Sequence, residues 1–175
     1  MHVQTHILSG WCVGNLLPLN ARQRLLCMLA ASLPDLDGLG VIVSQDAYWA
    51  MHHKVGHGIA FGVLLSGMLA AFSPRKMLSF LLYLSLLHLH LGMDVLGSGA
   101  NWDIYYLWPF SNFRIKTDWG WPLDSWQNIT IFSALLGWTV LIAIKQKRTP
   151  LELLMPSLDR QLVGRRLSTA QQSST

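Results

Sequence analysis

Hydrophobic residues in this chain gather into four or five runs that are separated by short polar or basic segments. The clearest run covers residues 77–97, close to the roughly 20 residues that an α-helix needs to cross a bilayer. We expect Pro34 to end the run before it, because proline cannot donate the hydrogen bond that a helix interior needs. The pattern predicts an all-α fold, a membrane bundle of about four to five short transmembrane or membrane-embedded helices. The shorter runs, each suited to a short span or to a buried core helix, cover residues 59–73, 129–144, 7–19 and 25–33.

The composition favours contact with lipid, although a large soluble helical core could share it. Hydrophobic residues make up 51% of the chain and charged residues 13%, against roughly 25% charged residues in soluble domains. The placement of charge favours a membrane. If each run crosses once, most basic residues fall on one side, which the positive-inside rule marks as cytoplasmic, and the N-terminus lies outside. Those residues are Arg22, Arg24, Arg75, Lys76, Lys145, Lys147, Arg148, Arg160, Arg165 and Arg166, and the acids on their side are Glu152 and Asp159.

The chain is expected to divide at the end of its last hydrophobic run. Residues 1–148 would form the membrane-embedded domain, and residues 149–175 a cytoplasmic tail, partly amphipathic and then disordered. The basic residues of the tail suit membrane lipids better than nucleic acid, and the sequence has no DNA-binding motif. Residues 98–127 form an external loop rich in tryptophan and tyrosine. Such a loop lies at the membrane–water interface, folds into a small aromatic core, or does both.

The same threading brings His and Asp residues from four segments to the outer ends of the runs. Ionisable groups inside or against a membrane are costly and are commonly functional. Binding of divalent metal ions would satisfy neutral imidazole and ionised carboxylate together. The residues concerned are His6, Asp35, Asp37, His52, His53, His57, His90 and Asp94.

Three short motifs carry most of these residues at spacings that suit shared coordination. His90 and Asp94 are four apart on a predicted helix, so they lie on one face. Asp35 and Asp37 alternate in an extended segment, so both can point to one centre. The segment "HHKVGHG", residues 52–58, holds three histidines just before a hydrophobic run. Each motif alone also has a structural explanation, such as a helix-ending turn or solvated loop histidines. The prediction of a metal site therefore depends on their convergence.

The motifs "THILSG", "LPDLDG", "HHKVGHG" and "HLHLGMDVLGSGANWDIYYLWPF", in this order, resemble those of the YdjM-like family. That family comprises bacterial inner-membrane-associated proteins described as metal-dependent hydrolases, some of them LexA-regulated. The resemblance covers roughly residues 1–145. It implies a metal-dependent hydrolase of the bacterial inner membrane, linked in some members to the SOS response. The family's His-x-x-x-Asp falls on His90 and Asp94, and its Gly-Ser-Gly on residues 97–99.

Two patterns disagree over the histidine that joins His57 as a ligand. The family motif reads approximately His-Arg-Gly-x-Thr-His-Ser, which aligns with His52 and His57 and puts His53 in the arginine place. Helical spacing instead favours His53, four residues before His57 and on the same helical face. If His52 is the ligand, the chain must be non-helical before His57, most easily at Gly56. We expect His52. The residues available as outer partners are His53, His88 and Ser98.

The expected chemistry is hydrolysis by a metal-activated water. Bound ions lower the pKa of water from about 15.7 to about 7, which gives a nucleophile at neutral pH. We expect two or more divalent ions, zinc or else manganese or iron, with Asp35 or Asp37 bridging them. The ligand types are analogous to those of zinc-dependent phospholipase C enzymes. A site at the outer face of the membrane, beside tryptophan rings, favours a phosphoester of a lipid or lipid-linked substrate. The catalytic candidates are Asp35, Asp37 and Asp94. The expected metal ligands are His6, Asp35, Asp37, His52, His57, His90 and Asp94.

Two non-enzymatic functions could use the same residues. A closed metal site would indicate a structural or interaction protein, but seven or eight ligands exceed what one structural ion needs. A metal or proton transporter would place ionisable groups near mid-membrane, whereas these gather at one face. The motifs of serine hydrolases, nucleotide hydrolases and dinucleotide-dependent oxidoreductases do not occur in the sequence. The hydrolase therefore remains the preferred hypothesis.

Overall fold

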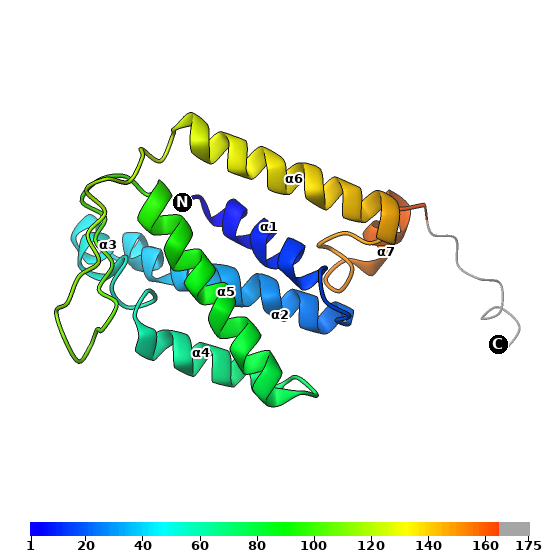
Figure 1. The fold of residues 1–175 in the computed structure, drawn as a ribbon, viewed down its shortest axis with the longest axis horizontal. Coiled ribbons are helices and arrows are strands. Elements are labelled where there is room, and N and C mark those ends of the chain that lie inside the picture. The colour runs from blue at the N-terminus through cyan, green and yellow to red at the C-terminus, as the bar shows by residue number, and fades with distance from the viewer. Residues whose placement is uncertain (165–175) are drawn as a thin grey trace, which may run out of the picture.

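The all-α prediction is confirmed by a computed structural model, which describes residues 1–164. In this range the β pairing is limited to one isolated bridge, between Ile104 and Ile115. Figure 1 shows that α1, α2, α4, α5 and α6 run back and forth along one axis, with α3 at one end and α7 at the other. The elements are α1 (Val3–Gly14), α2 (Ala21–Ser32), the 3-10 helix η1 (Leu33–Ile42), α3 (Gln45–Met51), α4 (Ile59–Ala71), α5 (Lys76–Gly97), α6 (Trp126–Gln146) and α7 (Pro156–Leu162).

The second helix begins and ends where its sequence requires. Asn20 and Gln23 form a reciprocal capping box at the start of α2, which satisfies backbone donors that lack a partner in the first turn. The α-helix ends at Ser32, just before Pro34, as predicted. The chain does not leave the axis there but continues as η1 to Ile42. This tighter helix carries Asp35 and Asp37 beyond the end of α2.

Within residues 1–164, three helical segments are long and apolar enough to cross a membrane: Ala21–Ile42, Lys76–Gly97 and Trp126–Gln146. Ile59–Ala71 is apolar but shorter. The first and third segments are longer than the hydrophobic runs from which they were predicted, because η1 extends one and polar end residues extend the other. The first and third segments differ in burial. Of an 18-residue apolar stretch in each, 44% is buried in Ala21–Ile42 but only 17% in α6. The outward side of α6 is thus available to lipid.

Two of the core's hydrophobic clusters share α2, and a third joins α5 to the loop 98–125. Leu26 and Cys27 of α2 pack with Leu65 of α4 and with Tyr83 of α5. On the other side, Met28 of α2 packs with residues of α1 and α6, including Trp11 and Ile142. Burial of these side chains is the main force that holds the helices together away from lipid. The arrangement leaves the ends of the bundle for polar groups.

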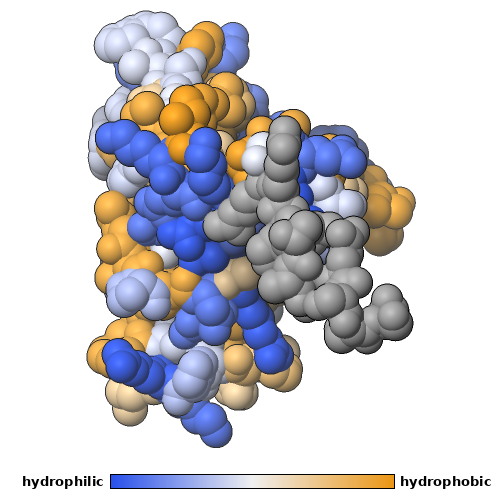
Figure 2. Space-filling view, turned by 90° about the vertical axis from the view of Figure 1, so that its right-hand side faces the viewer, coloured by the Kyte–Doolittle hydropathy of each residue, from blue (hydrophilic) through white to orange (hydrophobic). Residues whose placement is uncertain are grey.

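The two ends of the bundle differ in composition. One, here called the basic end, holds the turns between α1 and α2 and between α4 and α5, together with the segment after α6 (Figure 1). Figure 2 looks onto this end and shows hydrophilic side chains over its middle with hydrophobic ones around them. The other, here called the cluster end, holds η1, α3, the loop 52–58, the end of α5 and the loop 98–125. All the predicted metal ligands lie at the cluster end.

The long aromatic loop folds back over the cluster end. Its backbone binds the loop 52–58 and α4, through Tyr105 N–H to the His53 carbonyl (3.1 Å) and Ile59 N–H to the Tyr106 carbonyl (2.7 Å). Trp121 N–H also donates to the Leu96 carbonyl of α5 (2.9 Å). The loop is therefore a cover that is hydrogen-bonded to the helices beneath it.

The segment after α6 packs on the basic end. The Arg24 guanidinium donates to both Glu152 carboxylate oxygens, at 2.6 and 2.9 Å, and both side chains are nearly buried. Asp159, also buried, accepts hydrogen bonds from the backbone N–H and the hydroxyl of Thr149, at 2.6 and 2.8 Å. The two acids expected on the basic side thus both have structural partners. The predicted disordered end, with Arg165 and Arg166, lies outside the described residues.

Candidate metal centre

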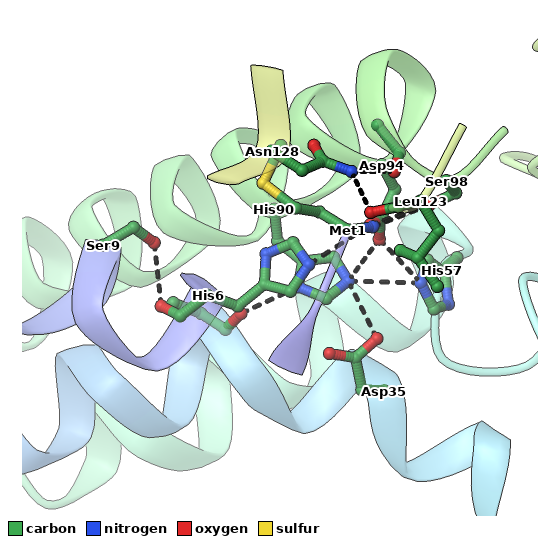
Figure 3. Close-up of polar contacts among 12 residues, drawn as sticks. Met1, His6, Ser9, Asp35, His57, His90, Asp94, Ser98, Leu123 and Asn128 are labelled. Atoms are coloured by element: carbon green, nitrogen blue, oxygen red, sulfur yellow. Dashed lines mark hydrogen bonds and ion pairs between the residues drawn. The ribbon is translucent and has the colours of Figure 1, made fainter. Parts of the chain in front are cut away.

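Four elements bring their His and Asp side chains to one buried point at the cluster end (Figure 3). α1 contributes His6, η1 contributes Asp35, and the loop before α4 contributes His57. α5 contributes His90 and Asp94 from one face, as their spacing of four residues predicts. The three histidines are fully buried, and Asp94 is 1% exposed.

Asp94 lies at the middle of this group. Its Oδ1 contacts His6 Nε2 at 3.2 Å and accepts from the Ser98 hydroxyl at 3.1 Å and from the amino nitrogen of Met1. Its Oδ2 lies 2.9 Å from His90 Nε2 and 3.3 Å from His57 Nε2. The two oxygens therefore face two different sets of histidines. Ser98 was expected as an outer partner, and it contacts Asp94 as such a partner would.

Hydrogen bonds at the far side of three imidazole rings set which nitrogen faces the centre. His90 Nδ1 donates to the Ala31 carbonyl at 2.8 Å, and His53 Nδ1 donates to the Trp102 carbonyl at 2.8 Å. His57 Nδ1 bonds to Asp37 Oδ2 at 3.0 Å. Carbonyl and carboxylate oxygens only accept, so the proton of each neutral ring is on Nδ1 and its Nε2 carries a lone pair. This is the outer arrangement that orients histidines around a metal.

The orientation brings acceptor atoms against one another. His57 Nε2 lies 3.1 Å from His90 Nε2, and both are close to Asp94 Oδ2; we call these three atoms the acceptor trio. Asp35 Oδ1 is 3.7 Å from His90 Nε2. Among the described residues, His6 Nδ1 and Asp35 Oδ2 are buried without any hydrogen-bond partner. Acceptors buried this close together are unfavourable unless they share a proton or a bound cation, so the group could hold a metal ion.

The pKa values of the two loop histidines, His53 and His57, are consistent with a site that could bind a cation. Burial by itself lowers the pKa of His57, but hydrogen bonds to Asp37 and Asp94 outweigh it and raise the pKa to about 9. Without a metal, a proton thus takes the place of the cation. Burial, reinforced by the neighbouring His57, lowers the pKa of His53 to about 3. His53 therefore stays neutral, the form in which imidazole binds metal.

The donor atoms fall into two groups, each with all its ligand atoms within 4.8 Å of one another. One group is His6, Asp35, His90 and Asp94, and the other is His53, His57 and Asp94. Asp94 belongs to both, so its carboxylate is shared by the two groups. Mixed nitrogen and oxygen donors suit zinc, manganese or iron. The buried His and Asp residues could thus hold a metal ion.

Two of the expected ligands, Asp37 and His52, lie one step outside these groups. Asp37 Oδ2 accepts from the Gly56 N–H at 2.9 Å as well as from His57, and its Oδ1 is 2.8 Å from His52 Nδ1. Both Asp37 oxygens are therefore engaged in holding the loop 52–58 and in orienting His57. The exact ligand set stays a prediction.

The disagreement between His52 and His53 has a conformational explanation. The backbone is non-helical from His52 onward, as the family alignment requires, yet His53 is the ring that joins the ligand group. His53 has φ of 62°, a left-handed conformation that is rare for a residue with a side chain. Gly56 lies so close to η1 that a Cβ there would be 2.1 Å from the Pro34 carbonyl oxygen. Only glycine fits this contact, which holds the turn that follows His53 against η1.

Other residues lie away from the centre or could not be found from the sequence. His88 is exposed, and its ring lies between the Leu84 carbonyl and the Tyr106 hydroxyl. Asn128 of α6 is buried and binds the Gly97 carbonyl at 2.8 Å and the Trp121 indole at 2.8 Å, which holds the aromatic loop to the end of α5. The backbone carbonyls of Ala31 and Trp102, which orient His90 and His53, cannot be predicted from the identity of a side chain.

Long apolar helices that end at a buried cluster of histidines and carboxylates define a membrane-type protein with a candidate metal centre. The chain matches the YdjM inner membrane protein family over residues 1–159, and it belongs to that family. No curated protein and no solved structure shows significant similarity to the chain. Family membership and the apolar helices together support a location in the membrane.

Proposed function

We propose that this protein is a multi-pass enzyme of the bacterial inner membrane that hydrolyses a phosphoester of a lipid or lipid-linked substrate. The observation that carries the proposal is the acceptor trio, in which two imidazole nitrogens and a carboxylate oxygen lie within 3.3 Å of one another and share at most the one proton of a charged His57. Two divalent ions, for preference zinc, would neutralise these groups and supply a nucleophilic hydroxide at neutral pH. Asp94, which belongs to both ligand groups, would help to hold both ions.

The residues around the ions have separate tasks in this proposal. His90 and Asp94 share one face of a rigid helix, which fixes the spacing of the centre. Asp37 keeps the proton of His57 on Nδ1 and so keeps Nε2 directed at the centre. Asp35, whose Oδ2 has no hydrogen-bond partner among the described residues, is the carboxylate best placed to accept a proton from an attacking water.

Access to the centre favours an enzyme over a closed structural site. A pocket of about 140 Å³ at the cluster end is lined by His52, His53 and Trp102. His53 also belongs to a ligand group, so the pocket lies next to one side of the centre. A structural ion would have all its positions filled by protein, whereas a catalytic ion keeps one open. Clustering of the ionisable groups at one end disfavours a transport path through the bundle.

The distribution of basic residues supports a periplasmic position for the centre. Eight of the eleven described Lys and Arg residues lie at the basic end, which the positive-inside rule assigns to the cytoplasm, whereas Lys54, Arg114 and Lys116 lie at the cluster end. The cluster end would then face the periplasm and meet the outer leaflet of the inner membrane. A lipid phosphate at that surface is the phosphoester nearest to the centre.

The test is hydrolysis by detergent-purified protein. Phospholipids and lipid-linked phosphates are supplied in mixed micelles, with and without EDTA, and with zinc or manganese added back. We expect release of a phosphate-bearing or dephosphorylated product that EDTA abolishes and metal restores, and that Asp94→Asn eliminates. Asp46→Asn, an exposed carboxylate on α3, serves as the matched control. Lack of metal-dependent turnover on any such substrate by the metal-loaded native protein would refute the proposal.

A further inference from the structure

The pocket beside the centre has a lining suited to recognition. Its walls include the rings of Trp49, Trp102 and Tyr105, and its charged members are Arg114 and Asp103. Trp49 and Trp102 lie against each other with ring centroids 4.8 Å apart. His53 connects this lining to the ligand group with His57 and Asp94. A molecule in the pocket would therefore lie next to the centre.

The charges around the pocket favour a negative group. Arg114 is half exposed, and its Nη1 is 3.4 Å from Asp103 Oδ2, so most of its five donors remain available. Lys54 approaches the Tyr105 ring at 5.2 Å, and Arg114 approaches the same ring at 5.8 Å. Two cations thus stand beside one acid. A positively charged group would meet repulsion from both, and the Tyr105 ring is already in contact with cations.

Exposed apolar side chains place the mouth of the pocket at a lipid surface. Trp49 lines the pocket and is 59% exposed, and Phe113, next to Arg114, is 55% exposed. Ile42 and Val43, directly before α3, are 77% and 81% exposed. Large apolar side chains with this exposure are stabilised at the membrane–water interface, where aromatic rings also concentrate. At that depth the pocket meets lipid headgroups.

We infer that this pocket binds the headgroup of an anionic phospholipid, and that Arg114 selects for its negative charge. The inference rests on the proposed function in one respect, since the bound lipid would present its phosphoester to the centre beyond His53. Headgroup binding itself needs no catalysis. Arg114 is a specificity residue here, because it lies in the pocket and outside both ligand groups.

The experiment measures binding of two short-chain lipids, dihexanoyl phosphatidylglycerol and dihexanoyl phosphatidylcholine, to the detergent-purified full chain by isothermal titration calorimetry. EDTA-treated protein is used, so that bound metal cannot attract the anion. One charged hydrogen bond predicts at least about tenfold tighter binding of phosphatidylglycerol. Arg114→Ala should reduce this ratio to about one, and Arg114→Lys should retain part of it. Lys116→Ala, an exposed cation two residues away and outside the pocket, is the matched control and should keep the native ratio.

Two results would overturn the inference: equal native binding of both lipids, or a preference that persists in Arg114→Ala. Glycerol 3-phosphate and inorganic phosphate, which lack acyl chains, should bind at least about tenfold more weakly than phosphatidylglycerol, since burying chain methylenes contributes to affinity. Equal affinity for these would show that the pocket takes free phosphate groups and not lipid. Hydrolysis is assayed on metal-loaded samples of the same variants. Turnover without headgroup preference overturns the pocket assignment alone, whereas preference without turnover supports it and counts against the proposed function.

Discussion

The two ends of the bundle bury charged groups in opposite ways. At the basic end, Arg24 and Glu152 share two hydrogen bonds, and Asp159 accepts two from Thr149. At the cluster end, His57, His90 and Asp94 direct acceptor atoms at one another. The groups of the basic end are satisfied within the chain, whereas those of the cluster end leave close acceptor atoms that a metal ion could bind. The comparison shows how a self-satisfied polar cluster differs from one that could hold an ion, although both are buried.

The largest effect is expected from Asp94→Asn, which removes the charge shared by both ligand groups. Loss of an outer partner of a metal ligand costs about 10–100-fold in affinity or activity, so loss of the shared ligand should exceed about 100-fold. Metal content by mass spectrometry and turnover on the hydrolysed substrate measure this. The variant should still insert in the membrane, because the helices are held by apolar contacts. Native metal content in Asp94→Asn would show that the cluster end does not depend on this carboxylate for metal binding, which would contradict the distinction between the two ends.

At the basic end, Arg24→Met should affect stability and not metal binding. Removal of one partner from a buried ion pair leaves the other charge unpaired, which costs about 3 kcal/mol. Thermal unfolding in detergent should show a lower midpoint than that of the native chain. EDTA should lower the unfolding midpoint by the same amount in Arg24→Met and in the native chain, because the candidate metal centre is unchanged. A variant that lost its bound metal would show that the two ends are coupled.

Asp37→Asn is expected to have a smaller effect than Asp94→Asn. Asp37 touches the centre only through His57, whose Nδ1 it fixes, so metal affinity should fall by about 10–100-fold and recover at high metal concentration. Titration with zinc distinguishes this from the loss of a direct ligand. If saturating zinc fails to restore binding, Asp37 is itself a ligand, as the sequence analysis expected.

The two neighbouring histidines give the finest distinction. His53→Ala should remove one ion, whereas His52→Ala should leave both ions with a reduced affinity through Asp37. Metal counting on each variant decides the matter, with His88→Ala as a control for an exposed histidine. The opposite pattern would restore the family-based expectation that His52 is the ligand.

The fold followed from the hydrophobic runs, and the convergence of the cluster followed from the alternation of helix direction. Apolar periodicity and the placement of Pro34 are local signals, and they predicted the helices well apart from η1 and α3. The choice between His52 and His53 could not be made in this way. It depends on the left-handed backbone at His53 and on the contact between Gly56 and the Pro34 carbonyl, which is long-range. The orienting carbonyls of Ala31 and Trp102 are equally invisible, because every residue has one.

The partners of Glu152 and Asp159 show the same limit. From the sequence these acids were merely exceptions on a basic side. Only the folded chain brings Glu152 to Arg24, 128 residues earlier. Pairings across such distances depend on how the helices pack and not on local sequence. Charge counts predicted the ends of the bundle but not the contacts within them.

The central claim is that the cluster end is completed by divalent ions held around Asp94. The most direct measurement is the metal content per chain of the native protein, purified gently in detergent and analysed by inductively coupled plasma mass spectrometry. The account predicts two divalent ions per chain in the native protein and in Asp46→Asn, and a loss in Asp94→Asn. A native chain that carries no divalent ion, and takes up none when zinc or manganese is supplied, would contradict it.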